Sequence, residues 1–129
     1  MMHRFCLRVY YEDTDFGGLV YYANYLKFIE RARSEWVRSL GIDQSKLKFE
    51  QGVVFAVSHL EAEYVMPAQF DDLLEVRTQL ESLTAARLIL SQEVCREEEL
   101  LFTAIVTLVA IRASGKPIRL PAEIRLLRG

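Results

Sequence analysis

A short acidic turn near the start of the chain carries the residues best suited to chemistry. Glu12, Asp13 and Asp15 lie close together there, and Gly17 and Gly18 follow directly. Glycine lets the backbone bend where a Cβ atom would clash, and it lets another group approach closely. A carboxylate on such a turn can act as a nucleophile or as a general base. Aspartate is also common in turns that do no chemistry, so this turn by itself does not establish a reactive site.

Two elements flank this turn and would position its carboxylates. The apolar, aromatic and β-branched run at 5–11 predicts a strand. Residues 23–40 carry apolar side chains at helical spacing and predict one long amphipathic helix. We expect Asn24 to cap the start of this helix and Gly41 to end it in a left-handed conformation. Charged side chains such as Arg33 should face solvent.

The second half of the chain has a hydrophobic period of two, which is typical of strands. The polar segment 42–52 should be a loop with a short helical turn. Strands are predicted at 53–64, 73–83, 86–95 and 100–111, turns at 97–99 and 114–117, and a closing helical turn at 121–127. One helix can cover a face of a five-stranded antiparallel sheet only if the sheet curls around it, so the predicted class is α+β. The outer face would stay partly apolar, which favours oligomers.

The composition is that of one globular domain, which we expect to span residues 1–129. With 16 basic and 18 acidic residues, a net charge of −2 and no basic cluster, nucleic acid is not an expected partner. The chain begins without the apolar core of a signal peptide, and no run approaches the ~18 apolar residues of a membrane span. Cys6 and Cys95 lack a CxxC spacing and should be reduced and buried, which favours a cytoplasmic location.

The acidic turn and the predicted helix together resemble a known enzyme family. The matching segments are VYYEDTD (residues 9–15), GLVYYANY (18–25) and FIERAR (28–33). They are similar to the hotdog-fold thioesterases of the 4-hydroxybenzoyl-CoA thioesterase family, and most of all to the acyl-CoA thioesterases encoded with the Tol-Pal system. The resemblance extends over the whole chain, and its first forty residues are the specific part. It implies a hotdog fold, with the sheet wrapped around the long helix.

The resemblance also implies an activity and an assembly. Asp15 would be the catalytic carboxylate of a thioester hydrolase that cleaves acyl-CoA to the free acid and coenzyme A. The protein would be a homotetramer, built as a dimer of dimers, with active sites between protomers. Many Tol-Pal-type members have histidine where this chain has Tyr22, whereas the 4-hydroxybenzoyl-CoA enzymes have tyrosine. The preference between short aliphatic and aromatic acyl groups therefore stays open.

Thioester hydrolysis requires few catalytic groups, because a thioester is already activated toward attack. Asp15 would attack the carbonyl or deprotonate a water molecule, and the sequence does not separate these roles. The backbone N–H groups of Tyr22 and Ala23, at the start of the helix, would polarise the carbonyl. Tyr22 acts in this prediction through its backbone or its side chain, and Tyr11 is a candidate for substrate contact. Asp13 is expected to be a turn residue at the surface.

Three basic residues are candidates for binding the phosphates of coenzyme A: Arg87, Lys116 and Arg119. His3 and His59 have no neighbours with metal-ligand spacing, so no metal site is predicted. There is no glycine-rich phosphate loop either, and no cofactor is expected beyond the coenzyme A thioester itself.

Other functions compete with hydrolysis. A non-catalytic hotdog module that binds acyl-CoA or an acyl carrier protein is the main alternative, and acyl carrier protein is a candidate partner of the enzyme too. Hotdog dehydratases pair a histidine with a helical acid, and this chain has no histidine between His3 and His59. A cone-shaped α+β fold that binds steroid-like ligands usually opens with helices, whereas this chain opens with a predicted strand.

Overall fold

The structure is a computed structural model that describes residues 2–127. Its strands are β1 (Met2–Arg8), β2 (Val53–Tyr64), β3 (Leu73–Leu83), β4 (Arg87–Arg96), β5 (Glu99–Arg112) and β6 (Pro117–Ile118). Its α-helices are α1 (Asn24–Ser39), α2 (Gln44–Gln51) and α3 (Ala122–Arg125), and a 3-10 turn, η1, covers Tyr11–Asp13. None of the helices in this range is long and apolar enough to cross a bilayer.

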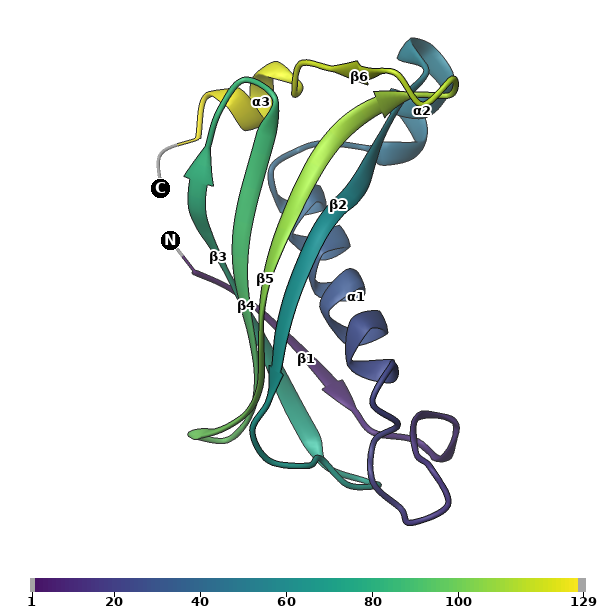
Figure 1. The fold of residues 1–129 in the computed structure, drawn as a ribbon, viewed down its shortest axis with the longest axis vertical. Coiled ribbons are helices and arrows are strands. Elements are labelled where there is room, and N and C mark those ends of the chain that lie inside the picture. Colours follow the sequence, from purple (N-terminus) through teal and green to yellow (C-terminus); the bar gives the residue numbers. More distant parts are fainter. Residues whose placement is uncertain (1, 128–129) are drawn as a thin grey trace.

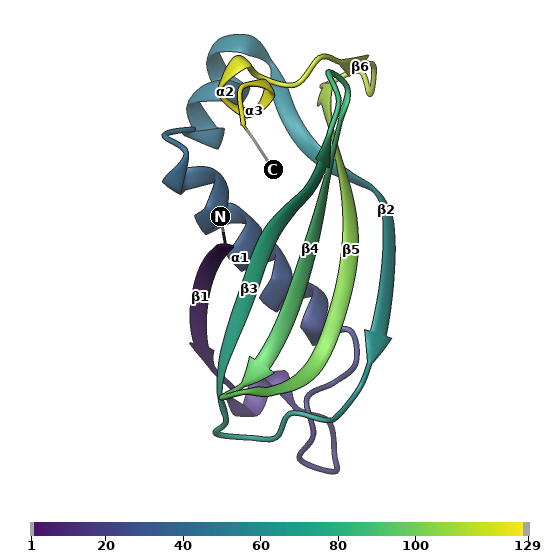
Figure 2. The same cartoon turned by 90° about the vertical axis from the view of Figure 1, so that its left-hand side faces the viewer.

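The sheet has the order β1-β3-β4-β5-β2, and all of its pairs are antiparallel. It curls along its length, and α1 lies against its concave face (Figures 1 and 2). The predicted α+β architecture is therefore confirmed, with β6 as an additional short strand beside β5. The strand predicted at 5–11 was misplaced, because the chain leaves the sheet after Arg8 and enters η1 at Tyr11.

Helix α1 supplies one half of the hydrophobic core. Its buried apolar residues are Tyr25, Phe28, Ile29, Ala32, Trp36 and Val37. They recur at the three- and four-residue spacing that puts side chains on one face of a helix. Leu26, which the apolar pattern included in this face, is instead 38% exposed. The strands contribute the rest of the core, mainly from every second residue of β3 and β4, whereas β5 also buries adjacent residues such as Leu101 and Phe102.

The two ends of α1 differ in how well they were predicted. Gly41 follows the helix with φ +84° and its N–H donates to the Arg38 carbonyl, which confirms the left-handed ending. The predicted Asn24 cap is wrong. Asn24 is the first residue of the helix, Ala23 occupies the cap position, and the Asn24 side-chain amide donates to Asp13 Oδ1 at 2.9 Å. Asn24 therefore connects the helix to the acidic turn instead of capping it.

A small polar network interrupts the core beneath the middle of α1. Gln92 is fully buried on β4, and its amide donates to the Ile29 carbonyl at 3.0 Å and to the Thr78 hydroxyl at 2.9 Å. The Gln92 carbonyl in turn accepts from the Arg33 guanidinium at 3.0 Å. Arg33 is thus half-buried and not the solvent-facing residue that the helical pattern predicted, and burial lowers its pKa. These bonds attach helix to sheet at a defined register.

The cysteines also differ from one another. Cys95 is buried and burial raises the pKa of its thiol, as expected for an inert core cysteine. Cys6 is exposed, contrary to the prediction, because the alternation of β1 directs it to the outer face of the sheet. Both thiols are free.

The Gln92 network predicts a specific loss of stability. Gln92→Leu fills nearly the same space but leaves the buried Thr78 hydroxyl and the Arg33 guanidinium without the hydrogen bond that Gln92 provides. We expect the free energy of unfolding to fall by about 2–3 kcal/mol, because each buried polar group left unpaired costs roughly 1–3 kcal/mol. Urea unfolding at a fixed protein concentration measures it. The control is Gln79→Leu on the exposed side of β3, and equal stability of the two variants would contradict the prediction.

Candidate active site

Asp15 is held by its own loop. Its Oδ1 accepts the N–H groups of Gly17 at 2.9 Å and Leu19 at 3.2 Å, so the side chain bridges the turn that follows it. Gly18 has φ +80°, which L side chains rarely adopt, and a Cβ atom at Gly17 would lie 3.4 Å from Asp15 Oδ1. The left-handed backbone at Gly18 therefore allows the loop to close around the carboxylate, whereas a side chain at Gly17 would meet Asp15 only at ordinary contact distance. Within residues 2–127, nothing donates to the other oxygen, Oδ2.

Asp13 has a different role from the one predicted. It is only 4% exposed and so is not a surface residue. Its two carboxylate oxygens accept from the Tyr10 N–H and from the Asn24 amide, both at 2.9 Å, and its carbonyl accepts the Tyr21 N–H at 2.8 Å. Because hydrogen bonds to a buried charge are among the stronger ones, Asp13 fixes the acidic turn against the start of α1.

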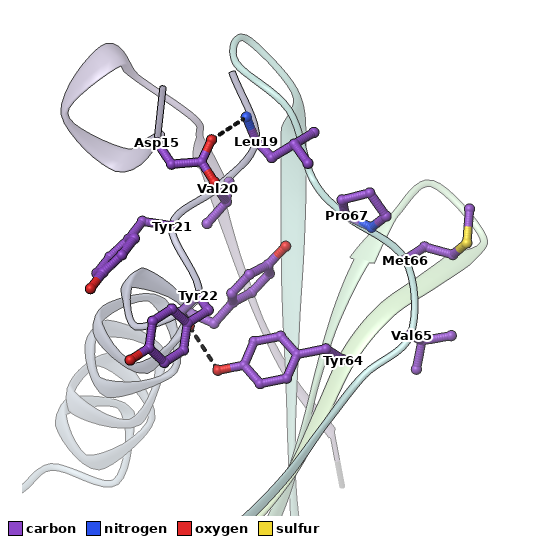
Figure 3. A pocket seen from close by; sticks show the side chains of 10 residues that line it. Asp15, Leu19, Val20, Tyr21, Tyr22, Tyr64, Val65, Met66 and Pro67 are labelled. Carbon is purple, nitrogen blue, oxygen red and sulfur yellow. Dashed lines mark hydrogen bonds between the residues drawn. The ribbon is translucent and has the colours of Figure 1, made fainter. Parts of the chain in front are cut away.

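A pocket of about 370 Å³ opens beside Asp15, between its loop, the start of α1 and the chain that leaves β2 (Figure 3). Asp15 contributes the one carboxylate among its lining residues. Most of the wall is aromatic or aliphatic, from Tyr21, Tyr22, Tyr25, Tyr64, Met66 and Pro67. A carboxylate at the edge of an apolar pocket suits a ligand with an apolar group next to a reactive polar centre.

The start of α1 supplies the unpaired donors that the sequence predicted. Tyr22 lines the pocket and Ala23 follows it at the cap position, which has no side-chain cap. In the part of the chain that the structure describes, neither N–H group has an acceptor. The helix dipole places partial positive charge at this end. Of the predicted site residues, Asp15 and Tyr22 line the pocket, and Ala23 is the next residue at the start of α1.

Two further tyrosines shape the pocket. The Tyr64 hydroxyl donates to the Tyr22 carbonyl at 2.8 Å (Figure 3), and the Tyr25 hydroxyl accepts the Ala68 N–H at 3.0 Å. Burial raises the pKa of Tyr25, although the Ala68 N–H acts in the opposite direction, and burial and the neighbouring Tyr22 raise the pKa of Tyr64. Both phenols therefore stay protonated at neutral pH.

The remaining predicted site residues lie elsewhere. Tyr11 is 80% exposed and stacks on Phe70 with ring centroids 4.3 Å apart, outside the pocket wall. Arg87 begins β4, and Lys116 and Arg119 flank β6. Figure 1 shows β6 at the opposite end of the molecule from the loop before α1. One protomer therefore does not bring these three basic residues to Asp15.

Sequence reasoning missed three residues that build the site: Asp13, Tyr25 and Tyr64. Tyr25 was assigned to the core, which is correct, but its hydroxyl also holds the segment opposite the Asp15 loop. For Tyr64 the available signal was weak, since an aromatic residue at the end of a strand is ordinary. For Asp13 the signal was present, because it belongs to the same DTD motif as Asp15.

Comparisons with known proteins identify the family of this chain. A sequence model of the Thioesterase superfamily matches residues 17–103. The acyl-CoA thioesterase YbgC of Haemophilus influenzae is 40% identical over 122 residues, covering 94% of this chain and 90% of that protein. The acyl-CoA thioester hydrolase YbgC of Escherichia coli O6:H1 is 39% identical over 125 residues, covering 95% of this chain and 92% of that protein.

A solved structure extends the likeness to three dimensions. The crystal structure of a probable thioesterase from Bartonella henselae superposes with a TM-score of 0.89 at 41% identity, covering 94% of this chain and all of that one (100%). The hotdog fold that the resemblance implied is thereby confirmed. With a family match over most of its length and relatives of this identity, the chain belongs to the Thioesterase superfamily and is an enzyme of the thioester hydrolase class.

Proposed function

We propose that the protein hydrolyses acyl-CoA to the free acid and coenzyme A, with Asp15 as the catalytic carboxylate. The observation that carries this proposal is the Asp15 carboxylate in an apolar pocket at the start of α1, where the Tyr22 and Ala23 N–H groups have no acceptor among residues 2–127. The names of the relatives support the substrate class, since both YbgC proteins are described as acyl-CoA thioesterases or hydrolases. Water and the thioester are the only reactants that this reaction needs.

In the proposed reaction the acyl chain occupies the apolar wall and the thioester carbonyl faces the start of α1. The Tyr22 and Ala23 N–H groups stabilise the oxyanion as it forms, and donors of this kind are typically worth roughly 10²–10³ in rate. Asp15 Oδ2, the oxygen outside the loop's own hydrogen bonds, attacks the carbonyl carbon or removes a proton from an attacking water. If Asp15 attacks, the C–S bond breaks to leave a mixed anhydride on Asp15, and water then hydrolyses this anhydride to release the acid. If Asp15 acts as a base, water adds to the carbonyl and the C–S bond breaks to give the acid directly. In both cases the thiolate of coenzyme A leaves and takes up a proton.

We propose further that two protomers complete each site, within a tetramer built as a dimer of dimers. Exposed aromatic and aliphatic side chains surround the pocket, namely Tyr10, Tyr11, Phe16, Tyr21, Met66 and Phe70. Such a patch is unusual for a monomer in water. A partner placed against it would also bring a second set of basic residues toward the pocket, where Arg87, Lys116 and Arg119 would meet the phosphates of coenzyme A. The same pocket would also accept the acyl group of an acyl carrier protein thioester. We propose a cytoplasmic location, where cysteine thiols such as those of this chain stay reduced.

A non-catalytic module that only binds acyl-CoA is the competing function. The apolar pocket fits both functions, but pure binding gives no reason for a carboxylate beside unpaired N–H donors. Turnover by the wild-type protein distinguishes the two directly.

The first prediction concerns Asp15. Asp15→Asn keeps the shape of the side chain but removes its basicity, so we expect thiol release from acyl-CoA to slow by about 100-fold or more. Release of free thiol across short aliphatic, aromatic and long-chain acyl-CoAs measures the rate. The matched control is Asp43→Asn at the start of α2, where asparagine caps as well as aspartate. Equal rates for wild type and Asp15→Asn would refute the assigned role.

The second prediction concerns the basic residues. Replacing Arg87, Lys116 and Arg119 together by alanine should raise KM for acyl-CoA by about tenfold, because phosphate pairing is lost while the reacting groups remain. The same variant should keep its KM for an acyl-pantetheine, which lacks the nucleotide. Lys48→Ala, on α2, is the control for a general loss of positive charge. A KM for acyl-CoA that does not change would remove these residues from the substrate site.

The third prediction concerns assembly. Light scattering at micromolar concentration should give the mass of a tetramer, because the apolar patch around the pocket needs a partner. Phe16→Asp places a charge at the most exposed part of that patch and should shift the mass downward. A monomeric wild type with full activity would contradict the shared site.

A further inference from the structure

The hydroxyl group of Tyr64 contacts the backbone that the proposed reaction depends on. Tyr64 ends β2, the edge strand of the sheet, and is separated from Tyr22 by 42 positions along the chain. Its hydroxyl donates to the Tyr22 carbonyl at 2.8 Å, and no other group of residues 2–127 donates to that oxygen. This carbonyl lies just outside α1, so the helix ladder does not use it.

Each of the two proposed oxyanion donors shares a peptide unit with a carbonyl that is itself hydrogen-bonded. A trans peptide is planar, and its C=O and N–H point in opposite directions, so holding one end aims the other. The Tyr22 N–H shares its peptide unit with the Tyr21 carbonyl, which accepts the Asn24 N–H at 2.8 Å. The Ala23 N–H shares its unit with the Tyr22 carbonyl, which Tyr64 holds. The first donor is therefore aimed by the helix and the second by the sheet.

We infer that Tyr64 is a positioning residue, which aims the Ala23 N–H at the thioester carbonyl by holding the Tyr22 carbonyl. The inference rests on the proposed hydrolase function and deepens it. Tyr64 does not need to touch the reacting atoms, because its effect passes through the peptide plane between Tyr22 and Ala23.

The Tyr64 ring packs on the core along one side, although the residue as a whole is 51% exposed. Its centroid lies 5.1 Å from that of Phe102 and 5.5 Å from that of Tyr25, both in edge-to-face geometry. Phe102 and Tyr25 are buried and stack on each other at 4.8 Å. Edge-to-face contacts of this kind favour a defined ring orientation. The core therefore orients the Tyr64 ring, and the hydroxyl at the end of the ring reaches the Tyr22 carbonyl at the start of α1.

Tyr64→Phe tests the inference, because it keeps the ring contacts and removes only the hydroxyl. We expect kcat for acyl-CoA to fall by about three- to tenfold, which is the effect of one net hydrogen bond on the transition state, and KM to stay within about twofold. The pH dependence of kcat should keep its shape, since the hydroxyl takes no proton from the reaction. Ser58→Ala, which removes an exposed hydroxyl from the same strand β2, should match wild type in kcat, and both variants should melt within a few degrees of wild type.

The alternative outcomes separate this inference from the proposed function. An active wild type whose kcat is unchanged in Tyr64→Phe overturns the inference alone. A raised KM with unchanged kcat also overturns it, since Tyr64 would then act in substrate binding. Loss of the alkaline limb of the pH profile would make Tyr64 a proton donor and not a positioning residue. A wild type that releases no thiol from any acyl-CoA overturns the proposed function itself.

Discussion

The buried carboxylate of Asp13 is the interaction on which the site depends. The Asp13 side chain accepts from the amide of Asn24, the first residue of α1, and from the Tyr10 N–H. The Asp13 backbone carbonyl accepts the Tyr21 N–H, so Asp13 connects the acidic turn to the chain on both sides. A buried charge without these partners would be costly, so the segment between β1 and α1 has one favourable arrangement. Asp15 can remain exposed, with no donor to Oδ2 in the described part of the chain, because Asp13, two positions earlier, holds the turn.

The aromatic residues form a second connection, between the edge of the sheet and the start of the helix. Tyr25 and Phe102 stack in the core, and Tyr64 packs against both before reaching the Tyr22 carbonyl. The pocket is therefore built where β2 ends and α1 begins, and its wall is rigid on the side of the core. The Asp15 loop closes the other side and is attached by the Val20 N–H, which donates to the Ala68 carbonyl.

The molecule separates its functional groups between two ends. The loop before α1, which carries Asp15, lies at one end of the molecule, whereas β6 lies at the other, with Lys116 and Arg119 on either side of it in the chain (Figure 1). An acyl-CoA molecule is divided in a similar way, with an apolar acyl group at one end and a polyanionic nucleotide at the other. This division gives the proposed shared site between protomers a chemical reason, because one chain alone does not bring the proposed phosphate-binding residues to the proposed acyl pocket.

Local patterns in the sequence were sufficient for most of the fold. The bounds of β2 and β3, the helical face of α1 and the left-handed Gly41 all follow from periodicity and backbone preference, which depend on neighbours along the chain. The family resemblance added Asp15 and the start of the helix. By contrast, the burial of Asp13, the Gln92 network and the Tyr64 bond depend on which polar groups face each other across the fold. Periodicity shows which face a side chain lies on but not which partner lies opposite, so only the tertiary structure could decide these contacts.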